Sequence, residues 1–191
     1  MYKKYQFPLN MFVVFEKINP VVYTSEVLTP NHYVCFIPLK WFYGINQFIK
    51  NELFYNFSTL IEVSAVDTLK YSKILPNIDI ILNKNRLIVF NLYYLYFSKV
   101  RLSLIMNFNS NQNHNQSIDK LYKNANWLER ETSEMFGVYY TFKKDQRILL
   151  LDYSKNETPF LKDFPCEGYS DIYYNFFENN LTYINHEFIE L

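Results

Sequence analysis

The hydrophobic positions after residue 31 change their spacing along the chain, and each change predicts a different element. Residues 32–39 (HYVCFIPL) form a short apolar run typical of a strand. A helix ending near Asn56 is expected next, because apolar side chains recur at helical spacing at Trp41, Ile45, Phe48, Ile49 and Leu53. Residues 57–66 alternate and contain β-branched side chains, which favours a second strand.

Two further strands are predicted, joined by a short turn. Residues 86–97 are apolar on both faces of the pleat, as in a central strand or one that a partner covers. Residues 100–108 alternate between apolar and polar side chains and indicate a half-exposed strand. Ser98 and Lys99 lie in the turn between them, although neither residue type is favoured in a hairpin turn.

A second amphipathic helix is predicted after the polar loop 109–116. Ser117 is a suitable N-cap, Asp119 favours a first helical turn, and Gly137 stands where a C-cap is expected. One narrow arc of the helical wheel contains Leu121, Ala125, Leu128, Thr132, Met135 and Phe136. We expect this arc to pack against the sheet.

The order of these elements predicts an α+β fold, with a core of strand, helix, three strands and helix around a mixed or antiparallel sheet. Residues 1–29 contain prolines and no sustained period, so we interpret them as an N-terminal arm. Residues 30–138 are the core domain. Residues 139–191 lose the periodicity and are interpreted as a long extended C-terminal segment that wraps a partner.

Composition narrows the classes of partner. The 19 basic and 19 acidic side chains cancel, so no positive field is available to gather nucleic acid. The 18 Tyr and 18 Phe are more than a domain of this size can bury, which indicates protein contact surface. The same bias suits an AT-rich genome, such as that of an organelle.

The sequence lacks the motifs of an iron–sulfur cluster, a nucleotide-binding loop and a membrane span. Cys35 and Cys166 are too few for an iron–sulfur cluster, which usually takes four thiolates. The three glycines are scattered, so neither a dinucleotide-binding nor a phosphate-binding loop is expected. The apolar run 87–97 is shorter than a membrane span. We therefore expect a soluble or peripheral protein.

The predicted second helix gathers Trp127, Glu129, Arg130, Glu131 and Glu134 within about two turns. Glu129 and Glu131 flank the apolar arc on opposite sides, so they diverge, which disfavours a pair of catalytic carboxylates. Arg130 and Glu134 have the spacing of an intrahelical ion pair. Trp and Arg on the outer face are typical of a protein interface, and an ordinary solvated charged face is the alternative.

The sequence ANWLERETSEMFGV at residues 125–138 is followed by DY at 152–153, KDFP at 162–165 and GY at 168–169. Together these motifs resemble the signature of the thirty-kilodalton subunit of respiratory complex I, the NADH:ubiquinone oxidoreductase. Weaker similarity extends to AVDTL at 65–69 and to the hairpin 86–106. The family usually has His-Pro where Lys143 and Lys144 stand and Arg where Ile148 stands, which puts the local loop shape in doubt. The interface or signature residues are Trp127, Glu129, Arg130, Glu131, Glu134, Arg147, Asp152, Tyr153, Lys162, Asp163, Phe164, Pro165, Gly168 and Tyr169.

The resemblance implies a non-catalytic structural or assembly subunit of the hydrophilic arm of mitochondrial complex I. It implies no cofactor in this chain, since FMN and the iron–sulfur clusters belong to partner subunits. Such a subunit packs against the forty-nine-kilodalton subunit near the quinone site, in a hetero-oligomer on the matrix side of the inner membrane. The alternatives are the equivalent subunit of a related membrane hydrogenase or plastid complex and, from another class, a free-standing hydrolase using Glu129 and Glu131.

Overall fold

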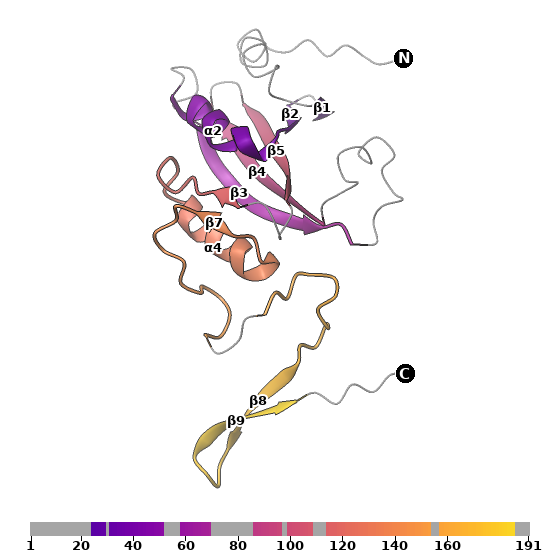
Figure 1. Ribbon diagram of the computed structural model, residues 1–191, viewed down its shortest axis with the longest axis vertical. Helices are drawn as coiled ribbons and strands as arrows, with labels where there is room; N and C mark the ends of the chain where they lie inside the picture. Colours follow the sequence, from indigo (N-terminus) through magenta and orange to yellow (C-terminus); the bar gives the residue numbers. More distant parts are fainter. Residues whose placement is uncertain are drawn as a thin grey trace.

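A five-stranded sheet with two helices forms the body of the molecule, and a two-stranded hairpin projects from it (Figure 1). The structure is a computed structural model that describes residues 24–29, 31–51, 58–69, 86–96, 99–108, 114–153 and 157–185. In Figure 1 the hairpin lies at the end of the molecule away from the sheet.

The strand order of the large sheet is β1-β2-β5-β4-β3. Strands β2 and β5 pair in parallel, and the other neighbours pair antiparallel, so the predicted mixed sheet is confirmed. The five strands are β1 (Thr24–Thr29), β2 (His32–Phe36), β3 (Ser58–Asp67), β4 (Leu87–Leu95) and β5 (Val100–Phe108). Strand β1 lies within the segment expected to be an arm, so the sheet begins before residue 30.

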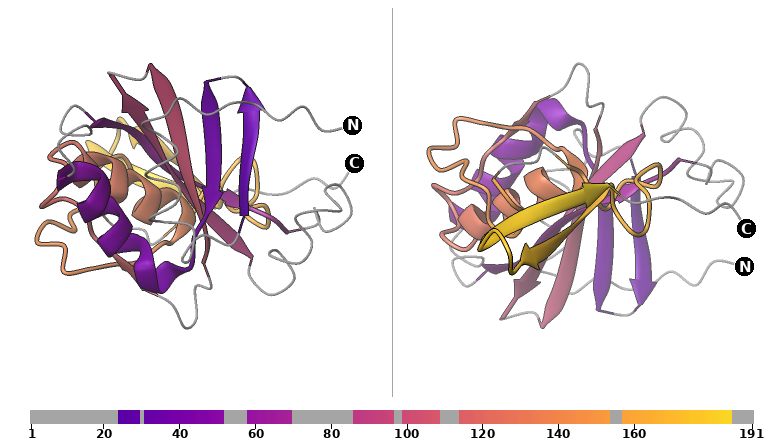
Figure 2. Two further views of the ribbon diagram at one scale, coloured as in Figure 1. Left: turned by 90° about the horizontal axis from the view of Figure 1, so that it is seen from above. Right: turned by 90° about the horizontal axis from the view of Figure 1, so that it is seen from below.

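The two helices among the described residues lie on the same side of the sheet (Figure 2). The expected first helix is a 3-10 turn η1 (Leu39–Trp41) followed by α2 (Phe42–Asn51), and the expected end near Asn56 lies outside the described residues. The second helix, α4, spans Ala125–Phe136 and packs along β3.

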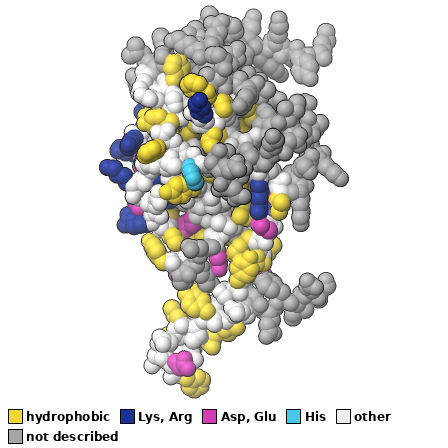
Figure 3. Space-filling view, in the orientation of Figure 1, with side chains coloured by type: hydrophobic (Ala, Val, Ile, Leu, Met, Phe, Trp, Pro, Cys, Tyr) yellow, Lys and Arg dark blue, Asp and Glu magenta, His cyan; other side chains and the backbone are white. Residues whose placement is uncertain are grey.

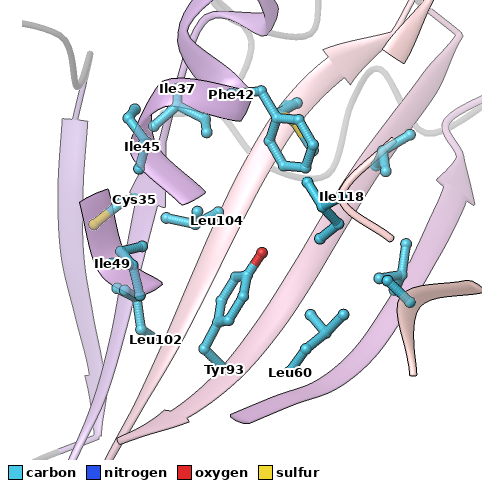
Figure 4. Packing of buried hydrophobic residues seen from close by; sticks show 14 of the residues in the cluster. Cys35, Ile37, Phe42, Ile45, Ile49, Leu60, Tyr93, Leu102, Leu104 and Ile118 are labelled. Carbon is cyan, nitrogen blue, oxygen red and sulfur yellow. The ribbon is translucent and has the colours of Figure 1, made fainter. Parts of the chain in front are cut away.

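The core fills the space between the sheet and these helices. Alternate residues of β4 are fully buried, and the side chains of α2 meet those of β2 and β5 (Figure 4). Burying each large aliphatic or aromatic side chain contributes about 1.5–3 kcal/mol. The buried Tyr93 hydroxyl donates to Asn46 Oδ1 and accepts from Asn91 Nδ2 at 3.1 Å, so its polar end is also paired.

Helix α4 begins at Ala125, so the predicted start at Ser117 is wrong. A short strand β6 (Asn115–Gln116) pairs in parallel with β7 (Tyr140–Thr141), and residues 117–124 form turns between β6 and the helix. The Ser117 hydroxyl donates to Glu129 Oε2 at 2.6 Å. Ser117 therefore does not cap the helix; its hydroxyl makes a tertiary contact with Glu129 in the first half of the helix.

The segment after β7 carries no helix among its described residues, as an extended segment predicts, but it ends in an antiparallel hairpin that the sequence did not predict. The hairpin consists of β8 (Ser170–Asn175) and β9 (Asn180–Asn185). Asn179 in its turn has a φ of 50°, a left-handed conformation that Asn tolerates well.

Candidate docking surface

Helix α4 is fixed at both ends by contacts that the sequence supplies. Asn124, just before the helix, donates its side-chain N–H to the carbonyl of Leu60 at 2.6 Å. Thr132 donates its hydroxyl to the carbonyl of Val63 at 2.9 Å. Strand β3 is an edge strand, and these two side chains bond its free carbonyls, which protects the edge from other pairing. Gly137 ends the helix with a φ of 73°, as predicted for a C-cap.

Glu129 lies in the core of this chain, away from the exposed surface that we expected for an interface residue. Its side chain is 1% exposed and forms an ion pair of 3.0 Å with Lys143, whose side chain is 2% exposed. The Ile118 N–H donates to Oε1 at 2.8 Å, and Ser117 donates to Oε2. Burial raises the pKa of Glu129, and the donors from Ser117, Ile118 and Lys143 oppose that rise.

Lys143 stands at one of the departures from the family pattern. Its ammonium also donates to the carbonyl of Asn126 at 3.0 Å, so it joins the start of α4 to the strand that follows the helix. The departure at position 143 therefore lies in a buried ion pair, whereas the sequence pointed only to an effect on local loop shape. Glu129 and Lys143 hold the helix, β6 and the region after β7 together as one unit.

Arg130 and Glu134 do not form the intrahelical ion pair predicted from their spacing. Arg130 donates to the carbonyls of Arg147 at 2.7 Å and Ile148 at 3.0 Å, and it pairs with Asp145 at 3.5 Å. Glu134 accepts the N–H groups of Leu149, Leu150 and Leu151. The outer face of α4 thus clamps residues 145–151 of its own chain, and the acidic partner of Arg130 is Asp145 of the same chain.

Glu131 lies on the other flank of the helix, half-buried beside β3. Burial, with a further contribution from the nearby charge of Glu131, raises the pKa of Glu62. Glu129 is enclosed in the core, so the two carboxylates do not meet at any surface that a substrate could reach. This arrangement speaks against the hydrolase alternative. Trp127 remains exposed on the outer side of the helix at 64%.

A second set of charges ties the C-terminal segment to the sheet. Asp67, at the end of β3, has a side chain that is 1% exposed and pairs with Arg86 at 2.8 Å. Arg86 also pairs with Asp163, and the N–H of Lys162 donates to Asp67 Oδ2 at 2.9 Å. Although burial alone would raise it, hydrogen bonds from Arg86 and from the N–H groups of Lys162 and Leu69 lower the pKa of Asp67 to about 2.

The remaining signature residues stabilise turns of the C-terminal segment. The Tyr153 hydroxyl donates to the carbonyl of Ile148 at 3.2 Å. Phe164 and Tyr169 stack edge to face, with centroids 5.1 Å apart. The N–H of Gly168, whose φ is 75°, donates to the carbonyl of Pro165 at 3.0 Å. Arg147 is exposed and pairs with Asp145 at 2.9 Å.

The hairpin is connected to this framework through Asp152, which accepts a hydrogen bond of 2.9 Å from the hydroxyl of Tyr183 in β9. Beyond that base its side chains are open: Phe177 at the tip is 99% exposed, Phe176 is 80% exposed and Leu181 is 65% exposed. Most of the exposed large hydrophobic side chains in the described part of the C-terminal segment therefore lie in the hairpin and its turn.

The described part of the chain holds no group of three or more His, Cys, Asp or Glu side chains placed to bind a metal ion. Within the same ranges, neither helix has the length and hydrophobicity that crossing a bilayer requires.

The family to which this chain belongs follows from a match over most of its length. Residues 40–170 match the family described as "Respiratory-chain NADH dehydrogenase, 30 Kd subunit". The chain belongs to this family. A relative named NADH-ubiquinone oxidoreductase subunit 9, from Paramecium primaurelia, is 35% identical over 188 residues, covering 98% of this chain and 88% of the relative. The predicted family resemblance is thus confirmed over nearly the whole chain.

Solved structures share the fold of this thirty-kilodalton family member. A trypsin-resistant fragment of Nqo5 superimposes with a TM-score of 0.56 at 17% identity, covering 72% of this chain and 98% of that one. A chain of a membrane-bound sulfane sulfur reductase, an archaeal respiratory membrane complex, gives a TM-score of 0.63 at 15% identity, covering 82% and 84%. At such identities the likeness concerns the fold.

Four residues that organise the site were absent from the predicted set: Asp67, Arg86, Ser117 and Lys143. Asp67 and Arg86 lie within the stretches of weaker family similarity, which could have drawn attention to them. Their pairing could not be predicted, because the two residues are 19 positions apart and no local pattern links them. Lys143 was noticed only as a departure from the family. Its role depends on β7 returning beside the start of α4.

Proposed function

We propose that this chain is a structural and assembly subunit of the hydrophilic arm of mitochondrial NADH:ubiquinone oxidoreductase, where it supports electron transfer from NADH to ubiquinone without catalysing it. The observation that carries the proposal is the family match over residues 40–170, together with a relative of nearly equal length named for that enzyme.

The geometry supports a non-catalytic part. Three of the four charged side chains of α4 bind their own chain: Glu129 pairs with Lys143, Arg130 with Asp145, and Glu134 with the backbone of residues 149–151. We propose that FMN and the iron–sulfur clusters lie in partner subunits, and that this chain provides ordered protein surface between them.

The forty-nine-kilodalton subunit is the neighbour we propose for the segment 139–191, close to the quinone site and on the matrix side of the inner membrane. This segment exposes Leu150, Tyr153, Phe160 and most of the hairpin, each at more than 40%. Apolar surface of that extent on a small subunit is typical of a protein contact. The exposed Trp127 of α4 is a second candidate contact, since Trp is enriched where interfaces are strongest.

Native electrophoresis of mitochondrial membranes tests the proposal. An antibody against this chain should detect it in the band that oxidises NADH, and mass spectrometry should identify the flavin-containing and quinone-site subunits in the same band. Migration as a free chain, or in a band with hydrogenase subunits, would contradict the proposal. The latter result would favour the related-complex alternative.

A further inference from the structure

The β8–β9 hairpin has two chemically different faces. The register places Ile172 opposite Tyr183 and Tyr174 opposite Leu181. Directly opposed residues of an antiparallel pair project to the same face, and the face alternates along each strand. One face therefore carries these four apolar or aromatic side chains, with the polar pair Ser170 and Asn185 at its base. The other face is mixed and contains Asp171, Tyr173, Asn175, Asn180, Thr182 and Ile184.

Neither face is covered by the described part of the body. The four side chains of the apolar face are 46–65% exposed, and the aromatic rings at the tip are more exposed still. A two-stranded hairpin alone in water is only marginally stable, because it has no third strand or helix on which to bury its apolar face. The sequence nevertheless places its bulkiest side chains here, which indicates that something else covers them.

Charge identifies what can cover this face. After Lys162 the chain contains no Lys or Arg, although it contains six acidic residues: Asp163, Glu167, Asp171, Glu178, Glu187 and Glu190. All 19 Lys and Arg residues lie at or before Lys162. In Figure 3 the projecting hairpin shows hydrophobic and acidic side chains on the face in view, while the Lys and Arg side chains gather on the body.

We propose that the apolar face of β8–β9 docks in an apolar groove rimmed by Lys and Arg side chains on a neighbouring protein subunit. The inference rests on the proposed function, and it adds the chemistry of the partner surface. Apolar contact supplies the attraction, while two nearby carboxylates, Asp171 on the mixed face and Glu178 in the turn, favour a cationic rim and oppose wrong partners. A second hairpin of the same charge and an anionic bilayer are both repelled.

The base of the hairpin is held for this contact. The Tyr183 hydroxyl binds Asp152, and the segment that leads into β8 is tied to the sheet through Lys162 and Asp67. A ribbon fixed at its base loses less conformational entropy on docking than a free tail.

Zero-length cross-linking of the native complex tests the proposal directly. A water-soluble carbodiimide joins carboxylates to amines in contact, so we expect Glu167, Asp171 or Glu178 to be joined to lysines of another subunit. Cross-links from these carboxylates to a second copy of this chain, or only to lysines of the same chain, would overturn the inference while leaving the proposed function intact. Absence of the chain from the complex would overturn the proposed function itself.

A matched pair of variants of the full chain sharpens the test. Leu181→Asp and Thr182→Asp each add one negative charge at neighbouring positions of β9, on the apolar and the mixed face respectively. We expect Leu181→Asp to reduce incorporation into the complex at least about tenfold and Thr182→Asp to change it about twofold or less. Equal incorporation of both variants, or a greater loss with Thr182→Asp, would overturn the choice of face.

Discussion

Helix α4 and the β8–β9 hairpin hold the two most distinctive parts of the sequence, and they differ in what their side chains contact. Three of the four charged residues of α4, Glu129, Arg130 and Glu134, bind their own chain, and Glu129 is enclosed with Lys143 in the core. The hairpin carries aromatic residues that its own chain leaves exposed, with Phe177 at 99%. The charged residues of the signature helix thus hold their own chain together, and we call α4 an internal frame for this reason. The surface that we propose for docking lies in the β8–β9 hairpin.

The largest effect is expected for the buried ion pair between Glu129 of α4 and Lys143, which anchors the helix within its own chain. Glu129→Leu leaves the Lys143 ammonium buried without its carboxylate, so we expect a loss of about 3–5 kcal/mol in the free energy of unfolding. Urea denaturation of the free chain measures it. The double variant Glu129→Leu with Lys143→Met is the control, since removing both charges should recover most of the loss. Equal losses in the single and double variants would contradict the ion-pair account.

The link between the sheet and the C-terminal segment should show in the pH dependence of stability. The pKa of Asp67 is about 2 in the folded chain and about 3.9 when unperturbed, so its contribution is complete above about pH 5 and declines as the pH falls toward 2. We expect Asp67→Asn to cost about 2 kcal/mol at pH 7 and less at pH 2.5. Urea denaturation at both pH values checks this, and a cost independent of pH would contradict it.

Arg130 sharpens the contrast between an internal clamp and an interface. Arg130→Met removes two hydrogen bonds to backbone carbonyls and the pair with Asp145, for an expected loss of about 1–3 kcal/mol. Limited proteolysis of the free chain should show faster cleavage within residues 145–151. Arg147→Met is a suitable control, because Arg147 is 74% exposed and should change stability by less than about 1 kcal/mol. If cleavage in Arg130→Met were unchanged, the internal clamp would be contradicted, and a contact of Arg130 with a neighbouring subunit would be favoured.

The smallest effect is expected at the tip of the hairpin. Phe177 is almost fully exposed, so Phe177→Ser should change the free energy of unfolding of the free chain by less than about 0.5 kcal/mol. Thermal denaturation provides the measurement. A clear loss of melting temperature would show that Phe177 packs against its own chain.

The parts of the fold that sequence could predict are those governed by local period. Strands β3, β4 and β5 begin and end within about two residues of the expected ranges, because alternation of side chains follows directly from the pleat. Gly137 was likewise assigned correctly as a C-cap, since a left-handed residue at that place favours glycine.

The parts that failed depend on contacts between distant segments. Glu129 was placed on the flank of the helix, and it became buried because β6 and Lys143 cover that flank. Ser117 was assigned to the helix N-terminus, but its hydroxyl serves Glu129. The hairpin lacks a glycine in its turn and carries aromatic residues on both faces, so no alternation marked its strands.

Hydrogen–deuterium exchange, compared between the free chain and the intact complex, tests most directly the claim that α4 is an internal frame and the hairpin a docking surface. Backbone amides of α4 and of β3 to β5 should be protected in both states, because their contacts lie within this chain. Amides of residues 170–185 should exchange rapidly in the free chain and slowly in the complex. Slow exchange of the hairpin in the free chain, or rapid exchange of the hairpin in the complex, would contradict the account.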